Sequence, residues 1–144
     1  MQRYLNPYQL IDFPKQKGAE LPDPLLVKEK VQAFLQPLNQ GTWVKPDWAE
    51  NELTKDEMDA AIGELDNPQI SFWHWRVYNH GGLLKFLNQG FISGLEHSGD
   101  LLKELGPGFV AFISPFFAEM VRDMLLNVLF QKLYRNMVLL TFRH

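Results

Sequence analysis

The chain has 144 residues, which fits a single domain on the usual scale of roughly 100–200 residues. Hydrophobic residues make up 46% and charged residues 22%, close to an average soluble protein, and this excludes a disordered or collagen-like chain. Lys and Arg number 14 against 17 Asp and Glu, a net charge of -3. Because nucleic-acid-binding modules normally carry a basic face, we expect no nucleic-acid partner. With no cysteine, disulfides and thiolate metal sites are excluded.

The first 23 residues hold Pro7, Pro14 and Pro22 and show no sustained periodicity. They predict a largely irregular segment, with one turn of helix at Pro7–Leu10. Asp23-Pro24 then has the form of an N-cap followed by proline in the first helical position. The apolar spacing that follows predicts a helix over about 24–35, ending near Pro37 and Gly41.

Thr54-Lys55-Asp56-Glu57 forms a capping box, which predicts a second helix through Leu65. Asn67-Pro68 ends that helix and starts another, which stops before Gly81-Gly82. Two short helices, over 83–87 and 98–105, are expected to end at the glycines that follow them.

Ser114-Pro115 predicts the start of a long amphipathic C-terminal helix. Phe109–Ile113 reads as a short strand, but a single strand makes no sheet. The sequence therefore predicts an all-α fold, a compact bundle of five to seven helices with the C-terminal helix as a central packing element. Residues 1–144 are expected to form one domain, with 1–23 as its irregular N-terminal segment.

The most apolar stretch, residues 109–140, is interrupted by five charged side chains: Glu119, Arg122, Asp123, Lys132 and Arg135. A membrane-spanning helix needs about 20 nearly uninterrupted apolar residues, so a membrane span is not expected and a cytoplasmic location is. A peripheral membrane role for residues 109–117 is one alternative. Another is homodimerisation through the apolar face of the final helix, or docking of a partner helix on it.

Chemistry-bearing motifs are few. No nucleophile elbow, phosphate-binding glycine loop or H-E-x-x-H pattern occurs, so we expect no cofactor and no catalytic residue. A small metal-dependent enzyme is kept as an alternative function. Its ligands would be His74, His80, His97 and Asp100, although histidines at a core edge and in loops explain the same residues without a metal.

Aromatic residues reach 13% of the chain, and tryptophans occur in two close pairs. Two residues at i and i+2 cannot share one helix face, so either Trp73 or Trp75 should lie at a boundary or an interface. Tryptophan is favoured in binding hot spots. These patterns predict a protein-binding surface, and its candidate residues are Trp43, Lys45, Pro46, Asp47, Trp48, Trp73 and Trp75.

Three segments, taken in order, resemble a J domain of the DnaJ type over about residues 5–80. Asn6-Pro7-Tyr8-Gln9-Leu10-Ile11 is similar to the family's opening, and Lys45-Pro46-Asp47 to its His-Pro-Asp loop. Asp66-Asn67-Pro68 and the later Tyr78 resemble the end of its third helix. The resemblance implies a chaperone-associated adaptor. Because lysine replaces the family's histidine, stimulation of the Hsp70 ATPase is not expected.

Taken together, the sequence predicts a non-enzymatic protein-interaction module that binds another protein, with the J-like adaptor as a special case. Substitution of Trp43 or Trp48 tests this prediction, because it should weaken binding of the partner without unfolding the domain.

Overall fold

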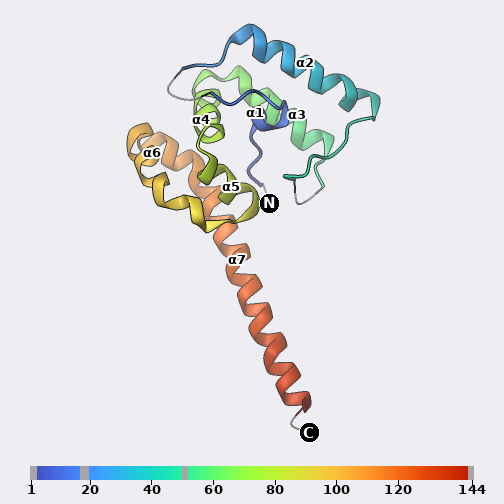
Figure 1. The fold of residues 1–144 in the computed structure, drawn as a ribbon, viewed down its shortest axis with the longest axis vertical. Helices are drawn as coiled ribbons and strands as arrows, with labels where there is room; N and C mark the ends of the chain where they lie inside the picture. Colours follow the sequence, from blue (N-terminus) through green and yellow to red (C-terminus); the bar gives the residue numbers. More distant parts are fainter. Residues whose placement is uncertain (1–2, 17–19, 50–51, 143–144) are drawn as a thin grey trace.

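The computed structural model describes residues 3–16, 20–49 and 52–142 (Figure 1). This part of the chain holds seven α-helices and two short 3-10 segments, and it contains no strand, which confirms the all-α prediction. The α-helices are α1 (Pro7–Leu10), α2 (Pro24–Gln40), α3 (Lys55–Gly63), α4 (Pro68–Tyr78), α5 (Gly81–Gln89), α6 (Ser98–Leu105) and α7 (Pro107–Phe142). The 3-10 segments are η1 (Glu64–Asp66) and η2 (Ile92–His97).

The predicted helix starts are confirmed by their caps. Asp23 Oδ1 accepts the Leu25 N–H at 3.1 Å, and Thr54 Oγ1 accepts the Glu57 N–H at 3.1 Å. Asn67 caps α4 in the same way. These side chains satisfy backbone donors that the first turn of a helix leaves unpaired. Local sequence therefore fixes where α2, α3 and α4 begin.

Helix α2 continues beyond residue 35 to the stop that was predicted near Pro37 and Gly41. It passes through Pro37 and stops at Gly41, whose φ of 74° is the left-handed conformation that glycine adopts readily. Proline removes one backbone hydrogen bond, but Phe34 and Leu38 on either side of it are buried. The packing of Phe34 and Leu38 thus stabilises the helix across Pro37.

The core forms around the N-terminal segment. Tyr4, Tyr8 and Phe13 are buried there although the segment is mostly irregular. They pack with α4 and α5, whose Trp75 and Leu83 are also fully covered. The single turn predicted at Pro7–Leu10 is observed with those bounds.

Helix α7 begins seven residues before the predicted start, at Pro107 rather than Ser114-Pro115. Ser114 does not cap it, because its hydroxyl donates back to the Val110 carbonyl at 2.5 Å. The predicted strand at Phe109–Ile113 is wrong, since these residues lie in the first two turns of α7, with Phe109 and Ile113 only 0% and 2% exposed. Burial of these two side chains overrides the local proline signal.

The two ends of α7 have different surroundings. Its N-terminal part packs on the other helices through Phe112, Phe116 and Met124. Residues 125–142, called the stalk here, leave this body and extend away from it (Figure 1), rising about 27 Å at about 1.5 Å per residue. The stalk therefore does not act as the predicted central packing element, and its exposed apolar side chains give it no single buried face: Leu125, Leu126, Val128, Leu129, Phe130, Leu133, Tyr134, Met137 and Leu139.

Candidate functional site

The two tryptophans of the segment between α2 and α3 lie in different surroundings. Trp43 packs edge-on against Phe34 of α2, with ring centroids 6.3 Å apart. Trp48 instead lines a cleft on the body. Lys45 and Asp47 are exposed, and Pro46 is half-buried. The predicted binding surface is therefore not one patch, and Trp48 is the member of this segment that faces a concave site.

Trp73 and Trp75 on α4 also have different environments. Trp75 is 1% exposed, its indole N–H donates to the Glu20 carbonyl at 2.9 Å, and its ring contacts Tyr8 and Phe13. Because a covered side chain cannot touch a partner, the prediction of Trp75 as a partner-binding residue is corrected to a core role. The half-buried Trp73 holds α7 against α4 through ring contacts with Phe109 and Phe112.

Gly108 lets α7 approach Trp73 closely. A Cβ at this position would lie 3.3 Å from the Trp73 ring, closer than ordinary van der Waals contact. The position of α7 on α4 thus depends on the small Gly108 facing the large Trp73 ring. Trp73 therefore acts in packing within the chain.

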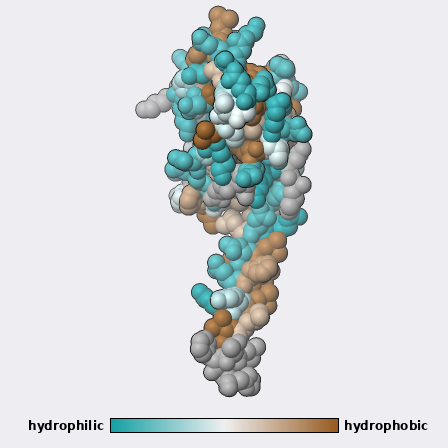
Figure 2. Space-filling model, turned by 90° about the vertical axis from the view of Figure 1, so that its right-hand side faces the viewer, coloured by the Kyte–Doolittle hydropathy of each residue, from teal (hydrophilic) through white to brown (hydrophobic). Residues whose placement is uncertain are grey.

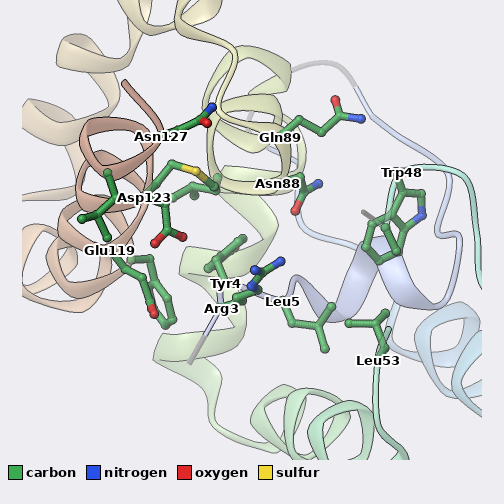
Figure 3. Close-up of a pocket in the computed structure, with 15 residues that line it drawn as sticks. Arg3, Tyr4, Leu5, Trp48, Leu53, Asn88, Gln89, Glu119, Asp123 and Asn127 are labelled. Carbon is green, nitrogen blue, oxygen red and sulfur yellow. The ribbon is translucent and has the colours of Figure 1, made fainter. Parts of the chain in front are cut away.

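The cleft that Trp48 lines has a volume of about 500 Å³. Figure 3 shows α7 side chains on one side, Trp48 and Leu53 on the other, and Arg3 to Leu5 between them. Four separate stretches of sequence contribute, which explains why sequence analysis found only Trp48. The polar lining residues are Arg3, Asn88, Gln89, Glu119, Asp123 and Asn127, and the apolar ones include Leu5, Trp48, Leu53, Leu87, Phe116, Met120 and Leu126.

The charges of the cleft are unequal. Glu119 and Asp123 on α7 face a single cationic side chain, Arg3. Glu119 also lies 3.7 Å from the Arg122 guanidinium, an i,i+3 pair on the same helix. Asn88 is held by a hydrogen bond from its Nδ2 to Gln9 Oε1 at 2.8 Å. The cleft thus combines apolar surface, fixed amide groups and an excess of negative charge.

A buried polar network stands behind the cleft wall. Asn6 Nδ2 donates to the Tyr4 hydroxyl at 2.8 Å and to the His74 carbonyl at 2.9 Å. Tyr4 Oη lies 2.9 Å from His74 Nδ1, and His74 Nε2 contacts the Glu64 carboxylate. Since a carboxylate only accepts, His74 Nε2 is the donor in its contact with Glu64.

Burial raises the pKa of the Tyr4 hydroxyl far above its ordinary value of 10.0, and the Glu64 charge adds to this, while the Asn6 hydrogen bond opposes it. Tyr4 therefore remains a protonated donor at neutral pH. With Asn6 and His74 fully covered as well, this network joins the N-terminal segment to α4 and η1. It is a structural element rather than exposed acid–base machinery.

The structure brings His80 and His97 together, with His80 Nε2 3.3 Å from the His97 carbonyl oxygen, but His74 lies elsewhere in the core. Both ring nitrogens of the buried His74 are already engaged. His80 caps α5, its Nδ1 accepting the Leu83 N–H at 3.2 Å, while His97 ends η2 and Asp100 lies in the first turn of α6. Among the residues that the structure describes, no group of three or more His, Cys, Asp or Glu side chains could hold a metal ion.

A second groove separates α2 from α3 and η1. Its volume is about 750 Å³, and its lining includes Val27, Val31, Leu35, Ile62 and Leu65 with Lys28 and Asp59 at its edge. Helix α2 is thus set off from α3 rather than closely packed on it.

Comparison of the chain with protein-family models, curated proteins and solved structures finds no match in any of the three. The J-domain resemblance accordingly stays a prediction based on the sequence. Within residues 3–16, 20–49 and 52–142, no helix is long and apolar enough to cross a membrane.

Proposed function

We propose that the protein is a non-enzymatic protein-interaction module whose body receives a short extended segment of another protein in the Trp48 cleft. The observation that carries the proposal is the position of Trp48 opposite the acidic wall of α7. An indole beside apolar side chains offers a large contact area, as in binding hot spots.

The polar groups of the cleft define the segment it would take. Asn88, Gln89 and Asn127 carry amides that can both donate to and accept from a peptide main chain. Glu119 and Asp123 outnumber the single Arg3, which favours a basic side chain on the ligand. The expected ligand therefore places an apolar side chain next to a lysine or arginine.

An array of unstructured peptides that pair leucine or an aromatic residue with lysine or arginine tests this proposal. Trp48→Ala and Asp123→Asn should each weaken binding of the selected peptides about tenfold or more, on the scale of lost hot-spot contacts. Trp43→Ala is the matched control, because Trp43 lies in the same segment but packs on Phe34. Absence of binding by the wild-type chain, or equal loss in all three variants, would refute it.

A J-like adaptor is the second candidate. Exposure of Lys45 and Asp47 on the loop between α2 and α3 favours it, because that is where the resemblance places its recognition motif. Steady-state ATP hydrolysis by an Hsp70 should be unchanged by the wild-type chain and stimulated by Lys45→His. Lack of stimulation by Lys45→His, with no binding of the Hsp70, would eliminate this candidate.

A further inference from the structure

One side of the stalk carries an apolar row with the spacing of a coiled-coil seam. Leu126, Phe130, Leu133 and Met137 follow at intervals of four, three and four residues, the 3.5-residue repeat that aligns side chains on one helix face. All four are exposed, Phe130 by 74% and Leu133 by 60%. Figure 2 shows apolar side chains as a strip along the stalk below the body. This row is called the seam.

The seam starts where α7 leaves the body. The two preceding positions of the same repeat are Asp123 and Glu119, charged residues of the cleft wall, and they separate the seam from Phe116 and Phe112, which pack on the body. At about 100° per residue, the seam lies about a third of a turn from the face that buries Phe109 and Ile113. Phe130, Leu133 and Met137 lie beyond the residues of α7 that line the cleft, which end at Asn127, so a helix can pack along this part of the seam outside the cleft.

From this arrangement we infer that the seam is an interface between two copies of this chain, formed by pairing of their stalks. The positions beside the seam carry no charge, being Asn127, Leu129, Tyr134 and Asn136. Identical helices therefore do not repel one another, whereas different coiled-coil partners are normally selected by charges at these positions. The two stalk charges up to residue 139, Lys132 and Arg135, lie on the opposite side of the helix.

The seam is open to a second copy. Its side chains are exposed by 48% to 74%, and the neighbouring Leu129 and Tyr134 are exposed by 55% and 70%. Because each copy contributes the same row, pairing covers both rows at once. The inference does not rest on the proposed peptide ligand, and the seam shares only its first residue, Leu126, with the Trp48 cleft.

Sedimentation of the full chain over a range of concentrations tests this inference. The wild-type chain, of 16.8 kDa, should sediment as a dimer, and Leu133→Glu should weaken association at least tenfold. Val128→Glu is the matched control, since Val128 is equally exposed but on the opposite side of the helix. A wild-type monomer at about 100 µM, or equal effects of the two substitutions, would overturn it.

Oxidative cross-linking provides a second test, since the chain has no cysteine of its own. Leu133→Cys chains should cross-link to one another in a parallel pair and to Phe130→Cys chains in an antiparallel pair. Val128→Cys should give neither product. A dimer in which no seam cysteine cross-links would contradict the inference and indicate contact elsewhere.

Discussion

The two halves of α7 show what the same helix does with and without neighbours. In the first half, Phe109 and Ile113 are fully covered and Trp73 packs against Phe109. In the stalk, Phe130 and Leu133 are equally apolar but face outward. Burial of apolar surface is the main stabilising term in folding. The body therefore holds the stability of the monomer, whereas the role that we infer for the stalk is association.

The largest expected effect contrasts Phe109 with Phe130. Phe109→Ala leaves a cavity in the core and should lower the free energy of unfolding by about 3–5 kcal/mol. Phe130→Ala, measured at a protein concentration low enough to keep the chain monomeric, should change it by less than about 0.5 kcal/mol. Urea denaturation of both variants checks this, and similar losses would remove the distinction between body and stalk.

The next largest effect concerns the buried hydrogen bonds of Asn6 in the body. Asn6 caps α1 through its Oδ1 and donates twice from Nδ2, and it is entirely buried. Asn6→Ala should cost about 2–4 kcal/mol, because it leaves buried partners unsatisfied. Asn67→Ala removes an exposed cap of the same residue type and should cost only about 1 kcal/mol. Equal decreases in Tm for the two variants would show that the buried network adds no stability beyond that of an exposed cap.

Alkaline pH should also act on the body. Burial raises the pKa of Tyr78 to about 12, and the nearby Asp12 charge adds to this. Below pH 10 both the folded and unfolded chains keep this proton, so no stability is lost. Between pH 10 and about 12 the unfolded chain releases it first, so stability falls as pH rises. Tyr78→Phe should flatten this fall in a series of unfolding curves, and an unchanged slope would contradict the assignment.

The smallest effect belongs to an exposed pair that joins α4 to α6. Arg76 donates to both carboxylate oxygens of Glu104, at 2.9 and 2.8 Å. These bonds lower the pKa of Glu104, so the pair stabilises above pH 4.5 and its contribution is lost as pH falls through the lowered value. Glu104→Gln should lower Tm slightly at neutral pH and converge with wild type in acid. A gap that persists in acid would point to packing instead.

Caps and glycines explain how much of the fold local sequence determines. Thr54, Asn67 and Gly41 each supply a specific hydrogen bond or backbone conformation, so the helices they bound were predictable. The start of α7 was not predictable in this way. Ser114-Pro115 has the pattern of an N-cap, but burial of Phe109 favours a helix that begins earlier. Such tertiary effects are invisible to local pattern.

The candidate site was less predictable than the fold. Trp48 was recognised from aromatic clustering, whereas Asn88 and Glu119 carry no local signal and join it only through the packing of α5 and α7. Trp75 has the same composition-based signal as Trp48 but is buried in the core. Aromatic density thus indicates large contact areas without indicating whether they are internal.

Hydrogen exchange across α7 at low and high protein concentration tests the central claim most directly. In dilute solution, amides around Ile113 should be well protected and those around Leu133 should exchange quickly, because Leu133 and its apolar neighbours Phe130 and Tyr134 are exposed. Raising the concentration should protect the stalk and leave the body unchanged. Uniform protection along α7 at every concentration would contradict the division into a self-sufficient body and an associating stalk.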